Sequence, residues 1–111
     1  MKLNMRMVQG IPDCWYSGTK TDLWVEWKYK KQLPATIDLT DKKNFLTANQ
    51  ELWLRQRHEE GRNVAVGLGT TKGGVLYFAG DIWLPKDRED FFLDAVPARE
   101  LARLIKLFVS A

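Results

Sequence analysis

The chain has 111 residues, a length that suits one compact domain and leaves little room for a second. Apolar residues make up 45% of the sequence, enough for a hydrophobic core, and the single cysteine excludes an internal disulfide and a cysteine-rich zinc site. The net charge of +3 is compatible with a polyanionic partner but does not identify one. No apolar run is long enough to cross a bilayer and no signal peptide is evident, so we expect a cytoplasmic protein.

The first third of the sequence favours strands. Residues 1–9 alternate weakly between apolar and polar side chains, which predicts a first strand. After a glycine–proline break, residues 13–16 and 22–29 have the composition of two strands, and the polar residues 17–20 between them form a turn. This segment is therefore predicted to be a β-hairpin.

A helix is predicted in the middle of the chain, after a polar stretch at 30–45 that shows no periodicity and that we interpret as a loop. Thr47 is a candidate N-cap, and Gln50 follows three residues later, as in a capping box. The helix is expected to end near Glu60, because Gly61 suits the left-handed position that follows a helix.

The last third of the sequence predicts a second hairpin and a final helix. Residues 63–69 and 75–79 are strands joined by a turn at 70–74, and residues 80–94 carry no clear pattern. Pro97 is expected to open a helix whose apolar stripe consists of Leu101, Leu104, Ile105 and Phe108. The whole chain therefore predicts an α/β fold with a mixed central β-sheet flanked by helices.

Three charged residues of the first hairpin form a candidate site. Glu26 and Lys28 are two residues apart on one strand, so their side chains project from the same face. A turn at residues 17–20 places Asp13 within cross-strand reach of Glu26. Two neighbouring carboxylates repel unless a cation neutralises them, and Mg²⁺ prefers such oxygen ligands.

This combination can hydrolyse a phosphodiester bond. A bound divalent metal makes a water molecule more acidic, and Lys28 can position that water or stabilise the charge on a phosphate. Glu26 and Lys28 alone would usually mean a solvated salt bridge on an exposed strand. The joint pattern with Asp13 favours a metal site.

These residues also carry a family resemblance, which covers about residues 7–68. The chain resembles the VRR-NUC family of the PD-(D/E)xK nuclease superfamily at Gly10-Ile11-Pro12-Asp13, Val25-Glu26-Trp27-Lys28, Gln50, Trp53 and Gly61-Arg62-Asn63-Val64. The resemblance implies a restriction-endonuclease-like core and a Mg²⁺- or Mn²⁺-dependent DNA endonuclease. Small stand-alone members are similar to phage-encoded enzymes, several of which cut branched DNA such as Holliday junctions as homodimers. Residues 69–111, a hairpin and a helix in the same predicted domain, show no motif of this kind.

The resemblance also implies roles for individual residues. Asp13 and Glu26 match the metal-binding carboxylates, and the carbonyl of Trp27 would complete the protein ligands. Lys28 matches the catalytic lysine. Gln50 matches a helical glutamine that faces the site, although its capping role explains the residue equally well.

One departure from the family pattern concerns the ligand set. Family members generally carry a glutamate on a helix ahead of the GxPD turn, whereas the nine residues before Gly10 contain no acidic side chain. Glu51, Asp22 or a partner subunit could supply the missing group if the geometry allows it.

Several lysines flank the proposed site and are candidates for contact with the DNA backbone, although such clusters are often only solvated. They are Lys30, Lys31, Lys42, Lys43 and, in the second hairpin turn, Lys72. The missing glutamate also leaves an alternative open: a non-catalytic DNA-binding or interaction module on a degenerate nuclease fold.

Overall fold

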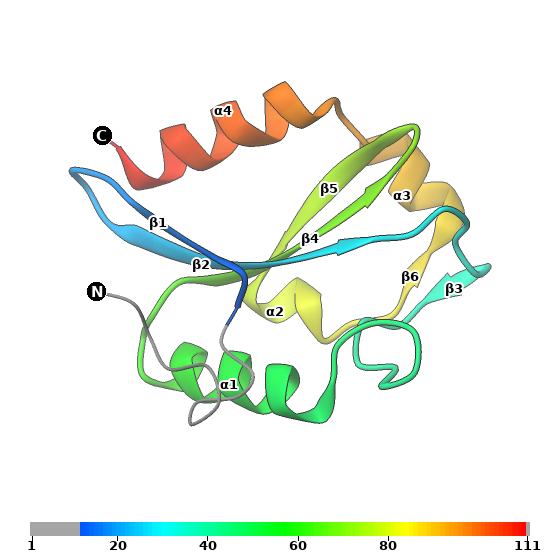
Figure 1. Ribbon diagram of the computed structural model, residues 1–111, viewed down its shortest axis with the longest axis horizontal. Helices are drawn as coiled ribbons and strands as arrows, with labels where there is room; N and C mark the ends of the chain where they lie inside the picture. Colours follow the sequence, from blue (N-terminus) through cyan, green and yellow to red (C-terminus); the bar gives the residue numbers. More distant parts are fainter. Residues whose placement is uncertain (1–11, 111) are drawn as a thin grey trace.

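The computed structural model describes residues 12–110, which form a four-stranded mixed sheet with helices on both faces (Figure 1). The predicted strand at 1–9 lies outside the described residues. No helix in the described range is long and apolar enough to span a membrane.

The central sheet has the strand order β1-β2-β4-β5. Its strands are β1 (Cys14–Ser17), β2 (Asp22–Tyr29), β4 (Val64–Thr70) and β5 (Gly73–Phe78). The pairs β1–β2 and β4–β5 are the two predicted antiparallel hairpins, and β2 pairs with β4 in parallel. Parallel neighbours need a long crossover connection, and here it contains helix α1 (Ala48–Glu59).

Helix α1 begins as the sequence predicts. The Thr47 side chain accepts a hydrogen bond from the Gln50 N–H, and the Gln50 side chain accepts one from the Thr47 N–H, which together form the capping box. After the helix, Gly61 adopts a φ of +84°, a conformation that L side chains rarely reach.

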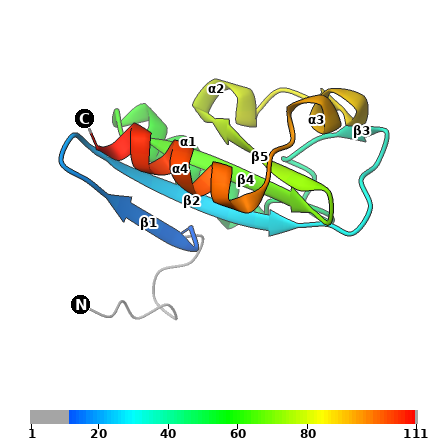
Figure 2. The ribbon, with the colours of Figure 1, turned by 90° about the horizontal axis from the view of Figure 1, so that it is seen from above.

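The two faces of the sheet carry separate cores because side chains alternate along β2. Leu23 and Val25 face helix α4 (Ala98–Val109), which crosses one side of the sheet (Figure 2). Trp24 faces α1 on the opposite side, where the larger core also includes residues of two short helices. These helices are α2 (Ala79–Ile82) and α3 (Arg88–Asp94).

Three sequence expectations need correction. The predicted loop at 30–45 contains β3 (Thr36–Ile37), which pairs with β6 (Lys86–Asp87) and buries Ile37 completely. Residues 80–94, which carry no clear pattern in the sequence, contain α2, β6 and α3, and α3 turns Phe91 into the core, where it is 1% exposed. Leu104, assigned to the packed stripe of the last helix, is 41% exposed.

Candidate active site

The register of the first hairpin brings Asp13 and Glu26 together. Cys14 pairs with Val25, so the same register one residue earlier sets Asp13 opposite Glu26. Asp13 Oδ2 accepts a hydrogen bond of 3.2 Å from the backbone N–H of Trp27, which holds the carboxylate against β2. Both acids therefore lie at one end of the hairpin, on the face covered by α1.

Glu26 is buried, with 2% of its surface exposed, and most of its polar contacts converge on one oxygen. Lys28 Nζ lies 3.5 Å from Glu26 Oε2, and Gln50 Nε2 donates to the same oxygen at 3.2 Å. The other oxygen, Oε1, is buried and finds no hydrogen-bond partner within residues 12–110. A buried acceptor left in this state is costly unless a ligand satisfies it.

This environment raises the pKa of Glu26 from 4.5 to about 7. Burial is the largest cause, the neighbouring charge of Asp13 adds to it, and the Lys28 ammonium opposes both. Burial therefore favours the protonated form of Glu26, and a cation at this position would favour its ionised form.

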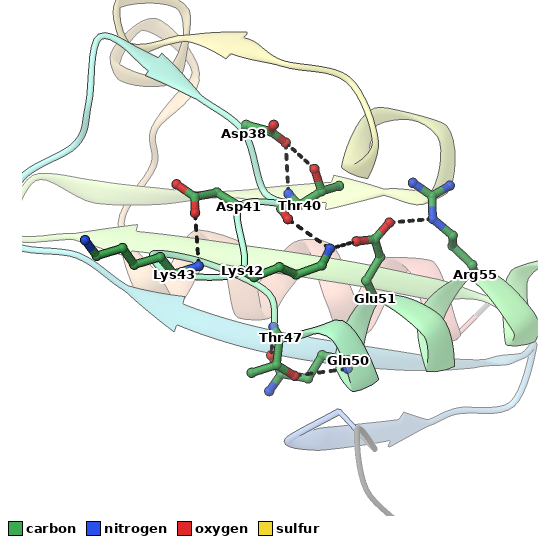
Figure 3. Close-up of polar contacts among 9 residues, drawn as sticks. All are labelled: Asp38, Thr40, Asp41, Lys42, Lys43, Thr47, Gln50, Glu51 and Arg55. Atoms are coloured by element: carbon green, nitrogen blue, oxygen red, sulfur yellow. Dashed lines mark hydrogen bonds and ion pairs between the residues drawn. The ribbon is translucent and has the colours of Figure 1, made fainter.

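The side chain of Gln50 serves the helix cap and the site at once. Its Oε1 accepts from the Thr47 N–H at 2.9 Å (Figure 3). Its amide nitrogen is then free to donate to Glu26 Oε2. The cap thus fixes the orientation of the amide that holds the Glu26 carboxylate. One side chain thus makes both the capping contact and the contact with Glu26.

The backbone of Trp27 also faces the Asp13 side of the candidate site. The N–H groups of Trp24 and Lys30 donate towards β4, so by alternation the peptide groups of Trp27 face the β1 side. The Trp27 N–H is bound by Asp13. Pro12, which the hairpin register sets opposite Trp27, has no N–H to donate to the Trp27 carbonyl. This carbonyl oxygen therefore receives no ladder hydrogen bond from position 12 and is a candidate ligand for a cation.

The donor set fits a hard divalent cation. The Asp13 and Glu26 carboxylates and the Trp27 carbonyl offer oxygen atoms alone, which Mg²⁺ and Mn²⁺ prefer. The unsatisfied Oε1 of Glu26 shows that the protein itself leaves one of these donors open. No group of three or more His, Cys, Asp or Glu residues that could hold a metal occurs in the described part of the chain.

The two proposed substitutes for the missing glutamate are engaged elsewhere. Glu51 forms ion pairs with Lys42 and with Arg55, whose Nε lies 2.7 Å from Glu51 Oε2 (Figure 3). Asp22 accepts a hydrogen bond of 3.0 Å from the indole of Trp15 and lies four strand pairs away from Asp13. The structure therefore brings neither acid to the site.

The flanking lysines differ in their surroundings. Lys30 lies over the Phe45 ring at 5.4 Å, and Lys42 is neutralised by its ion pair with Glu51. Lys31 and Lys43 are exposed, as is Lys72 in the turn between β4 and β5, where its ammonium lies 5.6 Å from the Phe92 ring centroid.

Two residues that support the site went unnoticed in the sequence. A Cβ on Gly67 would lie 2.2 Å from the Trp27 ring, so only glycine allows the indole to cross β4 there. The indole is also tied by a hydrogen bond of 3.0 Å from its Nε1 to the Tyr16 hydroxyl. The one available signal was a glycine inside an otherwise apolar strand, which often marks a close approach.

The comparisons with known proteins support the fold. No protein-family model matches the chain, and no curated protein matches it. A match among solved structures is the 1.6 Å structure of Archaeoglobus fulgidus Hjc, a Holliday junction resolvase from an archaeal hyperthermophile, with a TM-score of 0.54. The two chains are 18% identical, and the match covers 95% of this chain and 85% of that one. The predicted α/β fold with a restriction-endonuclease-like core is confirmed, whereas the likeness to the VRR-NUC family stays a resemblance.

Proposed function

We propose that this protein is a divalent-metal-dependent DNA endonuclease. The observation that carries the proposal is the cross-strand pair of Asp13 and Glu26, with Lys28 and Gln50 both contacting Glu26. The fold shared with a Holliday junction resolvase and the resemblance to a nuclease family support the same conclusion.

The residues have distinct roles in this proposal. Asp13, Glu26 and the Trp27 carbonyl would hold Mg²⁺ or Mn²⁺, which when bound acidifies water and offsets charge on a phosphate. Lys28 presents an ammonium 3.5 Å from Glu26, where it can orient the attacking water or stabilise the phosphate as the P–O bond breaks. Gln50 positions Glu26 through its amide.

The substrate we propose is branched DNA, cut by a homodimer. Support for branched DNA comes from the fold shared with Archaeoglobus fulgidus Hjc, a Holliday junction resolvase. Support for a dimer comes from apolar side chains exposed on α3 and α4, namely Leu93, Leu104 and Leu107. Lys30, Lys31, Lys43 and Lys72 are the candidate contacts to the DNA backbone, and Lys42 joins them only if it leaves Glu51.

The proposal is tested by Asp13→Asn and Glu26→Gln on four-way-junction, flap, linear and single-stranded DNA in Mg²⁺, Mn²⁺ and EDTA. Each variant should keep the fold and lose at least about 100-fold in cleavage rate, the order seen when a stabiliser of transition-state charge is removed. Glu51→Gln is the matched control and should retain cleavage, because Glu51 is bound to Lys42 and Arg55.

Cleavage that survives Asp13→Asn or Glu26→Gln would contradict the proposal. The alternative, a non-catalytic DNA-binding or interaction module, is favoured by the small number of acidic ligands at the site. Junction binding with no cleavage in either metal would support that alternative.

A further inference from the structure

An exposed tryptophan lies beside the proposed active site. Trp15 is 54% exposed, although indole is among the largest apolar side chains. It is two residues from Asp13 on β1, so both side chains project from the same face of the sheet. Two strand residues span about 6.8 Å, which places the indole roughly one nucleotide from the site.

The indole of Trp15 is held in place. Its Nε1 donates to Asp22 Oδ2 at 3.0 Å, and its ring stacks on Trp24 with a centroid distance of 5.8 Å and an angle of 29° between planes. Trp24 in turn packs edge-on against Trp53 of α1 at 5.1 Å. An exposed aromatic ring that is already fixed loses little conformational freedom when a ligand stacks on it.

The surroundings of this ring suit a nucleic acid strand. Helix α1 runs along β2, so that Gln50 forms a hydrogen bond with Glu26 and Trp53 packs against Trp24. Further along, the Arg57 guanidinium lies 5.3 Å from the Trp53 ring centroid. Arg57 and Arg62, which both form ion pairs with Glu60, are the cations near this end of the face that could contact a phosphate.

We propose that Trp15 is a stacking platform for an unpaired DNA base next to the scissile phosphate. This inference rests on the proposed function and deepens it, because it defines the substrate as DNA with at least one unpaired base at the branch. A base within a duplex is covered on both faces by its neighbours, whereas an unpaired base has a free π-face for an aromatic side chain.

Cross-strand packing is the other role open to Trp15. A Trp15–Trp24 pair stabilises a hairpin through the contact between the two rings. That contact needs no DNA and leaves the outer face of Trp15 without a function. The two readings differ in a measurable way, because only a stacking platform distinguishes a base from an abasic site.

The test uses forked DNA with unpaired arms and an otherwise identical fork that is abasic at the nucleotide flanking the branch. Binding is measured in EDTA by fluorescence anisotropy for the wild type, Trp15→Ala and Trp15→Phe. We expect the wild type to bind the intact fork about tenfold more tightly than the abasic fork. Trp15→Ala should reduce this ratio of affinities, intact fork over abasic fork, to about one. Trp15→Phe should retain part of the ratio.

Tyr29→Ala is the matched control. Tyr29 is 62% exposed on the neighbouring strand but projects from the other face, so its removal should leave the ratio unchanged. A second readout places 2-aminopurine at the flanking nucleotide, since its emission falls when it stacks. Emission should fall on binding to the wild type and to Tyr29→Ala, and should stay high with Trp15→Ala.

Equal weakening of both forks by Trp15→Ala, or unchanged 2-aminopurine emission, would overturn the inference and assign Trp15 to the hairpin alone. Binding is measured without cleavage, so the two proposals can fail separately. If the ratio of affinities depends on Trp15 but the protein cuts no DNA, only the proposed function is refuted. If the protein cuts forks but binds the intact and abasic forks equally well, only the stacking platform is refuted. Failure to bind any fork would refute both.

Discussion

Glu26 is an acid in a position where its charge is poorly tolerated without a cation. Its side chain is buried, one oxygen is unsatisfied, and Asp13 lies opposite it across the hairpin. The Lys28 ammonium favours the ionised form but does not overcome the effect of burial on the pKa of Glu26. The protein therefore keeps a local instability at the position where a metal is proposed to bind, which is common at functional sites.

This instability gives the metal-free protein a predictable pH dependence. The folded pKa of Glu26, about 7, exceeds the ordinary value of 4.5, so the folded state favours the protonated form. The stabilisation is complete below pH 4.5 and is lost as the pH rises to 7. The free energy of unfolding should fall by about 3 kcal/mol over this range. Urea unfolding in EDTA should show this decline in the wild type relative to Glu26→Gln.

The control for that experiment is Glu51→Gln. Ion pairs and hydrogen bonds from Lys42 and Arg55 lower the pKa of Glu51 against the opposing effect of burial, so its contribution is present at neutral pH and lost in acid. The difference between wild type and Glu51→Gln should therefore change with pH in the opposite direction. A difference between wild type and Glu26→Gln that is independent of pH would contradict the raised pKa of Glu26.

At the scale of elements, the site depends on how closely β2 and β4 pack. Trp27 pairs with Gly67 in the parallel register, and its indole lies directly over that glycine. The ring is attached to the same residue whose N–H binds Asp13 and whose carbonyl is proposed to bind the metal. A shift of the ring would therefore move the backbone of the site.

Gly67→Ala should be destabilising and should weaken Mn²⁺ binding. The new Cβ would lie 2.2 Å from the Trp27 ring, and overpacking of this kind costs about 1–3 kcal/mol of unfolding free energy. Urea unfolding measures the stability, and titration calorimetry with Mn²⁺ measures the binding.

Gly69→Ala provides the matched control on the same face of β4. The nearest atoms to its Cβ would lie at 3.9 Å, an ordinary contact distance, so stability and Mn²⁺ binding should stay near those of the wild type. Equal effects of the two substitutions would show that the Trp27–Gly67 contact does not support the site.

At the scale of the whole molecule, metal binding should stabilise the fold. A ligand at 100 times its Kd adds about 2.7 kcal/mol, which for a domain of this size corresponds to a rise in Tm of about 10 °C. Differential scanning fluorimetry with Mn²⁺ at pH 8 should show this rise, and Asp13→Asn and Glu26→Gln should abolish it. Asp90→Asn, at an exposed position on α3, should leave it intact. A Tm that does not respond to Mn²⁺ or Mg²⁺ would favour the non-catalytic module.

The local features of this protein can be predicted from its amino-acid sequence. The two hairpins and the cap of α1 follow from alternation, turn residues and the spacing of Thr47 and Gln50, all of which act within a few residues. The proximity of Asp13 and Glu26 belongs to the same class, because the length of the turn sets the cross-strand register.

The way in which these local features combine into a site depends on contacts between elements that are distant in the sequence. The position of Gln50 on Glu26, the burial that raises the Glu26 pKa and the passage of Trp27 over Gly67 join segments that are 24 to 40 residues apart. The pairing of β3 with β6 and the burial of Phe91 likewise depend on distant partners. Such contacts leave no period or spacing in the sequence, because their free energy comes from packing between elements rather than from the preferences of neighbouring residues.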